Sequence, residues 1–144
     1  MKKILLLFTF LFIVCTGKMI SQNLPQRLYV IDKSIQGYQE FSSALVSGGK
    51  ILVLPETGNP LDQIRIALTG NKYDEVHIYT NVKTGSVVFN SLALTSDELS
   101  AQSSLLNNFK SLVSPSGKII IHGNPGDAWI NKLKLLTGIE VVSE

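Results

Sequence analysis

The residues whose types and spacing best suit chemistry lie near the end of the chain, in the segment IIIHGNPGDAW (residues 119–129). Three consecutive isoleucines predict a buried strand, and a Gly- and Pro-containing turn leads from it into an amphipathic stretch. In open α/β proteins, ligands bind beyond the carboxyl ends of the strands. His122, Gly123 and Asn124 are therefore candidate ligand-binding residues.

Two further polar residues follow predicted strands and would lie at the same edge of a sheet. Asp32 ends the apolar run RLYVID, and Asn81 comes directly after DEVHIYT. Asp32 has a second interpretation, as the N-cap of a helix that begins near Ser34, and the sequence supports both equally. If these side chains converge with those of the turn in a concave pocket, the domain would bind or hydrolyse a small ligand there.

The familiar cofactor and catalytic motifs are absent from the sequence. The first strand is not followed by the G-x-G-x-x-G of dinucleotide-binding folds, and Gly49-Lys50 precedes a strand instead of ending a phosphate-binding loop. No serine stands in a G-x-S-x-G elbow. His77 and His122 lie on different predicted strands, and neither has a second ligand at metal-binding spacing. We therefore expect no metal and no cofactor, and interpret His77 as a histidine satisfied within the sheet.

The turn HGNPGD (residues 122–127) also suggests an anion site, because backbone N–H groups at a helix N-terminus attract negative charge. Asp127 opposes that interpretation, since we expect it to cap the following helix with its own carboxylate. The turn alone therefore does not predict a bound anion.

The first residues have the layout of a secretory signal peptide. Lys2 and Lys3 precede an unbroken apolar run from Ile4 to Val14, which is too short to span a bilayer comfortably, and small residues follow. The pattern predicts a signal peptide over residues 1–21 and a mature domain over residues 22–144. We expect the protein to be secreted or held at the cell envelope, with no membrane span after processing.

The single cysteine and the charge balance both belong to this leader. Cys15 resembles a lipoprotein anchor, but Val14 stands where a small residue is preferred, which argues against lipidation. The mature domain would contain no thiol and no disulfide. Loss of three lysines with the leader changes 13 basic against 11 acidic residues to 10 against 11. No basic surface remains to indicate nucleic acid, so a protein or a cell surface is the expected partner.

The rest of the chain alternates between apolar strands and amphipathic helices. Strands are predicted over residues 27–32, 50–55, 74–80, 118–123 and 139–143, helices over 34–49, 96–113 and 127–138, a turn followed by a helix over 56–71, and a β-hairpin over 84–95. Asn59 and Pro60 form an N-terminal helix signal, and Gly138 a stop signal. Continuously apolar strands that alternate with helices predict a mainly parallel sheet covered on both faces, a three-layer αβα sandwich of the Rossmann-like kind.

The order of these segments resembles the DUF4347 domain. The resemblance rests on YVIDKSIQGYQEF, LVLP, LDQIRIALTG, EVHIYTN, GSVVFNSLALT, IIIHGNPG and LKLLTGIEVVSE, and it covers residues 27–144. It implies an N-terminal module of large secreted bacterial surface proteins with a caspase-like or gingipain-like fold. Members of that family commonly carry a His-Gly pair after the third strand and a Gly-Cys pair after the fourth, which would correspond to a cysteine-peptidase dyad.

The chain departs from the family pattern at both dyad positions. Asn81 and Val82 stand where the His-Gly pair would fall, and Asn124 follows Gly123 where the cysteine would be. An amide supplies neither a thiolate nor a base, so the resemblance implies a site without its catalytic residues.

Two functions therefore remain open. The first is a non-catalytic, secreted module for surface attachment or protein interaction, expected as the N-terminal part of a larger adhesin. The alternative is a small-ligand binder or hydrolase that uses the crevice at the carboxyl edge of the sheet.

Overall fold

The computed structural model describes residues 24–144. The predicted signal peptide and the predicted role of Cys15 lie outside the described residues. Within residues 24–144, no helix has the length and apolar character needed to cross a membrane.

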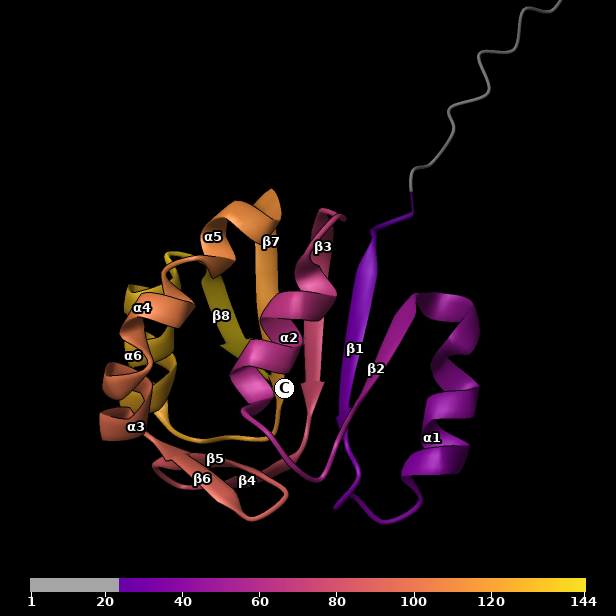
Figure 1. The fold of residues 1–144 in the computed structure, drawn as a ribbon, viewed down its shortest axis with the longest axis horizontal. Helices are drawn as coiled ribbons and strands as arrows, with labels where there is room; N and C mark the ends of the chain where they lie inside the picture. Colours follow the sequence, from indigo (N-terminus) through magenta and orange to yellow (C-terminus); the bar gives the residue numbers. More distant parts are fainter. Residues whose placement is uncertain (1–23) are drawn as a thin grey trace, which may run out of the picture.

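A five-stranded parallel sheet forms the centre of the domain, with the strand order β2-β1-β3-β7-β8 (Figure 1). Its strands are β1 (Arg27–Asp32), β2 (Lys50–Leu54), β3 (Tyr73–Tyr79), β7 (Val113–His122) and β8 (Glu140–Ser143). The predicted α/β class and parallel sheet are confirmed. The sequence indicates these strands because their apolar runs are continuous, as buried parallel strands require.

A small antiparallel sheet is inserted between β3 and the next helix. It consists of β4 (Asn81–Lys83), β5 (Ser86–Phe89) and β6 (Leu92–Thr95). The predicted hairpin corresponds to β5 and β6, which turn at Asn90, where φ is 52°. The third strand, β4, is too short and polar to be indicated by periodicity.

The helices are α1 (Tyr38–Leu45), η1 (Val46–Gly48), α2 (Pro60–Leu68), α3 (Ser96–Ala101), α4 (Ser103–Leu106), α5 (Phe109–Leu112) and α6 (Asp127–Thr137). Two predicted helices need correction. The first begins only at Tyr38, because Gly37 adopts a left-handed conformation with φ of 73° just before it. The helix predicted over residues 96–113 is divided into α3, α4 and α5. Serine and asparagine side chains compete for its backbone carbonyls, as Asn108 Nδ2 does when it donates to the Ser104 carbonyl at 2.9 Å.

The predicted helix ends are partly confirmed. Asn59 caps α2, and its side-chain oxygen accepts the Leu61 N–H at 3.0 Å. Gly138 ends α6 in a left-handed conformation. The predicted capping role of Asp127 is wrong: Gly126 is the N-cap and Asp127 is the first helical residue, where its charge still favours the helix dipole.

One face of the sheet carries nearly all the helices and the main core. Leu28 and Val30 of β1 and Ile119 and Ile121 of β7 point into a single buried cluster. Helices α2 to α6 and the inserted sheet supply the rest of that cluster with Leu61, Ile64, Leu68, Val87, Phe89, Leu94, Leu99, Leu106, Phe109, Trp129 and Leu133. These helices share a face because β2→β3, β3→β7 and β7→β8 all cross the sheet in the same direction with the same handedness.

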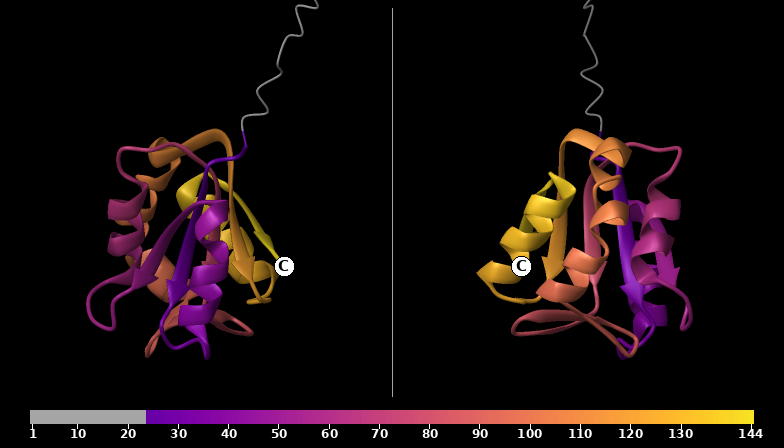
Figure 2. Two further views of the ribbon diagram at one scale, coloured as in Figure 1. Left: turned by 90° about the vertical axis from the view of Figure 1, so that its right-hand side faces the viewer. Right: turned by 60° about the vertical axis from the view of Figure 1, so that its left-hand side comes forward.

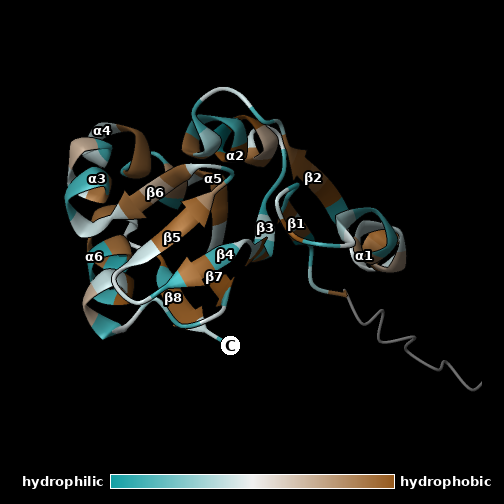
Figure 3. Cartoon of the chain, turned by 90° about the horizontal axis from the view of Figure 1, so that it is seen from below, coloured by the Kyte–Doolittle hydropathy of each residue, from teal (hydrophilic) through white to brown (hydrophobic). Residues whose placement is uncertain are grey.

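The opposite face of the sheet is only partly covered. Connection β1→β2 runs the other way, so α1 packs on this face against β1 and β2 (Figure 2). Figure 3 shows α1 well apart from the other helices. Helix α1 reaches β3 through Phe41, whose ring packs edge-on against Tyr79 with centroids 4.7 Å apart. The three predicted layers are therefore present, but one outer layer is a single helix. We call the side of β3, β7 and β8 that lies beyond α1 the open face.

Candidate functional site

The carboxyl edge of the sheet, where a ligand crevice was expected, is occupied by the inserted β4–β6 sheet (Figure 3). Hydrogen bonds join this insertion to the loops after three strands. Asn90 donates from its backbone to the Asp32 carboxylate after β1 and from Nδ2 to the Pro55 carbonyl after β2, the latter at 2.9 Å. Gly85 N–H donates to the Pro125 carbonyl after β7 at 2.7 Å. The insertion is thus fixed across the mouth of the edge.

Asp32 holds the insertion in place. Its side chain is 0% exposed, and it accepts the Ser34 N–H at 2.8 Å, lies 3.2 Å from the Thr80 hydroxyl and accepts the Asn90 N–H. The interpretation of Asp32 as a helix N-cap is wrong, because α1 begins at Tyr38. The carboxylate instead closes a local turn and anchors the hairpin, so its oxygens are already engaged.

The other candidates at this edge also bond within the protein. Asn81 Nδ2 donates to Ser34 Oγ at 2.9 Å, and Asn124 Oδ1 accepts the Gly126 N–H at 2.9 Å. Gly123 N–H donates to the Glu144 carbonyl at 2.7 Å, which engages a donor that the anion interpretation would need.

A hollow of about 370 Å³ does lie at this edge, and it is lined by Lys33, Ser34, Glu56, Asn90 and Ser91. None of the five candidate residues lines it. The structure therefore does not bring Asp32, Asn81, His122, Gly123 and Asn124 together around this hollow.

His122 lies elsewhere, on the open face of the sheet. Tyr79 of β3 is its direct register partner, and the two rings stack with centroids 3.9 Å apart and an interplanar angle of 7°. His77 stands two residues before Tyr79 on the same face, and its Nδ1 lies 3.0 Å from His122 Nε2. This pair cannot be found from either strand taken alone. The signal for it is that both histidines lie near the ends of strands that are neighbours in a parallel sheet.

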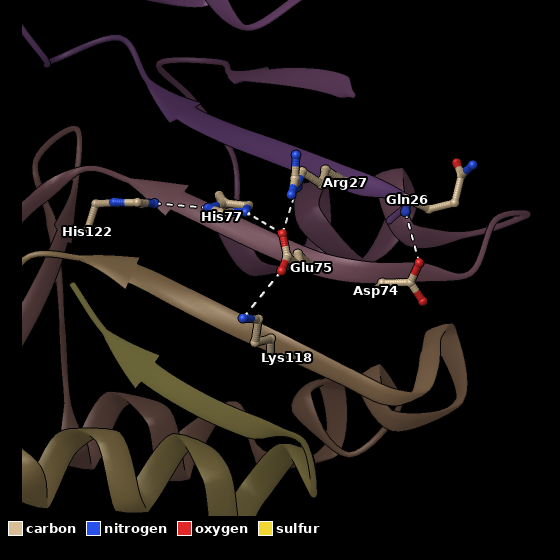
Figure 4. A network of polar contacts seen from close by, with 7 residues as sticks. All are labelled: Gln26, Arg27, Asp74, Glu75, His77, Lys118 and His122. Atoms are coloured by element: carbon tan, nitrogen blue, oxygen red, sulfur yellow. Dashed lines mark hydrogen bonds and ion pairs between the residues drawn. The ribbon is translucent and has the colours of Figure 1, made fainter. Parts of the chain in front are cut away.

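Glu75 extends the histidine pair into a polar network along β3 (Figure 4). One oxygen lies 3.2 Å from His77 Nε2 and 2.7 Å from Arg27 Nε, and the other lies 3.3 Å from Lys118 Nζ. The Arg27 hydrogen bond is the main cause that lowers the pKa of Glu75 to about 2, and His77 and Lys118 add to it against the opposing effect of burial. Glu75 is therefore a carboxylate at neutral pH.

The ionised carboxylate fixes one proton of the pair. Glu75 can only accept, so His77 carries a proton on Nε2, and a neutral His77 then accepts at Nδ1 from the Nε2–H of His122. Burial, followed by the neighbouring His77, lowers the pKa of His122 from 6.5, against the effect of Glu144. His122 is thus held in a hydrogen-bonded chain with His77 and Glu75, and its lowered pKa favours the neutral imidazole.

Replacing Glu75 with glutamine is expected to destabilise the domain at neutral pH by roughly 1–2 kcal/mol, since its ion-pair partners are partly exposed and screened. The pKa of Glu75 is lower in the folded state, so its contribution is full above the ordinary pKa of 4.5 and disappears as the pH falls towards 2. Denaturant unfolding at several pH values should show the wild-type advantage shrinking over that range. Glu56→Gln, at an exposed position, is the matched control and should cost less than about 0.5 kcal/mol at neutral pH. An advantage that persists unchanged at the lowest pH would contradict the assignment.

Comparisons with known proteins give a family and a distant structural likeness. The family model described as "Domain of unknown function (DUF4347)" matches residues 28–144. No curated protein matches the chain. Among solved structures, the chain is similar to lactate dehydrogenase from Eimeria maxima with NADH and oxamate, at 14% identity and a TM-score of 0.46. The match covers 88% of this chain but only 45% of that enzyme chain.

Proposed function

Because this chain belongs to the DUF4347 family, a family of unknown function, we propose that it is a secreted, non-catalytic module that acts in cell-surface attachment or protein interaction. It would serve as the N-terminal part of a larger bacterial surface protein. The predicted signal peptide and the family resemblance support this context.

The insertion across the carboxyl edge supports the non-catalytic part of the proposal, because the hollow that remains there is lined by none of the five candidate residues. Peptidases and small-ligand enzymes with parallel sheets need an accessible crevice at this edge. Here the insertion is hydrogen-bonded to the loops after β1, β2 and β7, and the Asp32 carboxylate is fully buried beneath it. Asn81 and Asn124, at the two dyad positions, can supply neither a nucleophile nor a base.

The open face supports the interaction part of the proposal. Sheet faces in α/β domains are normally covered by helices. Among the described residues, the aromatic contact of α1 with this side of β3 is at Tyr79 only, and Val142 of β8 is half-buried on the same side beside Ile120. A partner that packs on this face would cover it.

The test is binding of the labelled, purified protein to cells of the source species. We expect saturable binding that Val142→Glu weakens roughly tenfold or more, because a carboxylate would be buried in the contact. Leu135→Glu is the matched control, since Leu135 lies on α6 at 76% exposure and its change should leave binding intact. Thermal unfolding would verify that both variants fold.

Two results would overturn the proposal. One is an absence of saturable binding by a folded wild-type protein. The other is hydrolysis of a protein substrate such as casein that is lost on Asn124→Ala, because that residue has no catalytic part in a binding module.

A further inference from the structure

We propose that His77 and His122 form a binding site for a divalent transition-metal ion of the kind that imidazole prefers, such as Zn²⁺, Cu²⁺ or Ni²⁺. They are the only histidines of the chain, and they come from β3 and β7 on the open face. The site shares the open face with the proposed partner contact, but its test uses a metal salt alone and does not depend on whether the domain attaches to a surface.

The spacing of the two ring nitrogens suits a shared metal. His77 Nδ1 and His122 Nε2 lie 3.0 Å apart, as Figure 4 shows along its line of dashed contacts. Zinc–imidazole bonds are about 2.0–2.1 Å long, so two nitrogens at this separation subtend an angle close to 90° at the ion. With the same bond lengths, a tetrahedral angle at the ion requires the two nitrogens to lie about 3.4 Å apart. Binding therefore requires the His122 ring to turn on its stacked partner Tyr79, so that the lone pairs of the two nitrogens converge on the ion.

Glu75 gives His77 the support that metal-binding histidines usually have. Its carboxylate accepts the Nε2–H of His77 at 3.2 Å, which leaves the Nδ1 lone pair directed towards His122. This is the carboxylate–histidine–metal arrangement, in which the outer carboxylate fixes the ring and raises its basicity. Arg27 and Lys118 in turn hold the Glu75 oxygens in place.

Metal binding also changes the proton positions of the pair. An imidazole binds a metal through an unprotonated ring nitrogen, so the ion must displace the proton that lies between His77 Nδ1 and His122 Nε2 in their hydrogen bond. When that proton starts on His122 Nε2, it leaves to water and Nδ1 of the same ring takes one from water, so this step releases no net proton.

His77 and His122 supply two ligands of the ion, which leaves its other coordination positions to be filled. Within residues 24–144, no third His, Cys, Asp or Glu completes a metal-binding group with the pair. The remaining coordination positions therefore go to water.

Calorimetric titration of the full-length protein with ZnCl₂ or NiCl₂ alone tests the site, in a Cys15→Ser background that removes the one thiol. We expect one ion per chain, with affinity lowered by more than roughly tenfold in His77→Gln and in His122→Gln. Glu75→Gln should weaken binding by about 10–100-fold, the usual effect of removing such an outer carboxylate. Glu56→Gln is the control for loss of one exposed carboxylate and should bind like the parent.

A second measurement distinguishes loss of the site from loss of the fold. Paramagnetic Ni²⁺ should broaden the ring resonances of both histidines in the parent, and neither histidine variant should lose its circular dichroism spectrum. No binding by the parent, or equal affinity in His122→Gln or Glu75→Gln, would overturn the proposal.

Discussion

Replacing Asp32 with alanine is expected to lower the free energy of unfolding by about 3 kcal/mol or more. The change removes a fully buried carboxylate and leaves the N–H groups of Ser34 and Asn90 without their acceptor, while the Thr80 hydroxyl keeps the Val88 carbonyl. Unsatisfied buried donors cost about 1–3 kcal/mol each when water cannot reach them. Urea unfolding monitored by circular dichroism would measure the difference.

Asp62→Ala is the matched control for Asp32→Ala. Asp62 lies in the first turn of α2, and its ion pair with Arg65 joins two side chains that are 40% and 37% exposed. Its loss should cost less than about 1 kcal/mol. In Asp32→Ala, limited proteolysis should also cut first in the β4–β6 insertion. Equal stabilities for the two variants would show that Asp32 does not anchor the insertion.

Replacing Gly123 with alanine is expected to destabilise the domain by about 2–4 kcal/mol. Gly123 has φ of 129°, a conformation that other residues rarely adopt. A Cβ atom there would lie 2.8 Å from both Cβ and Cγ2 of Val82 in β4. Overpacking of this kind adds about 1–3 kcal/mol to the conformational cost. Thermal or urea unfolding would measure the loss.

Gly126→Ala in the same turn distinguishes the conformational cost of a positive φ from the cost of a steric clash. Gly126 also has positive φ, 93°, but a Cβ there would meet nothing within 4 Å, so only the conformational cost of about 1–2 kcal/mol applies. A double-mutant cycle of Gly123→Ala with Val82→Gly should show that the second change recovers part of the loss. Additive effects in that cycle would contradict a direct contact between the turn and β4.

The strands and most helices could be predicted from the sequence because their signals are local. Continuous apolar runs mark the parallel strands, and Asn59-Pro60 and Gly138 mark helix ends by their own backbone preferences. The helix over residues 96–113 was predicted as one element because its buried residues, such as Leu99 and Leu106, keep helical spacing. What divides it is the competition of serine and asparagine side chains for backbone carbonyls, which periodicity does not record.

The candidate site depends on information that single strands do not contain. Asp32 and Asn124 were correctly placed at strand ends, but whether they face a cavity or a lid depends on the path of the insertion. His77 and His122 come together only through the register of β3 on β7, which aligns Tyr79 with His122. Sequence periodicity indicates which face a residue occupies within its strand, and not which residue stands beside it.

The insertion also bears on the order in which the chain folds. Strands β5 and β6 pair across a tight turn at Asn90, so this hairpin closes a short loop and can form in microseconds. Each pair of neighbouring strands in the parallel sheet, in contrast, brings together segments that are far apart in the sequence. The pairing of β3 with β7, for example, places Val76 beside Ile119. Such non-local pairing is slow because the loop entropy is lost before the contacts are gained. The hairpin can therefore form early, but it can dock only after the loops that follow β1, β2 and β7 are in place. The indole N–H of Trp129 donates to the Leu94 carbonyl of β6. The fluorescence of Trp129 during refolding would therefore report this late docking step.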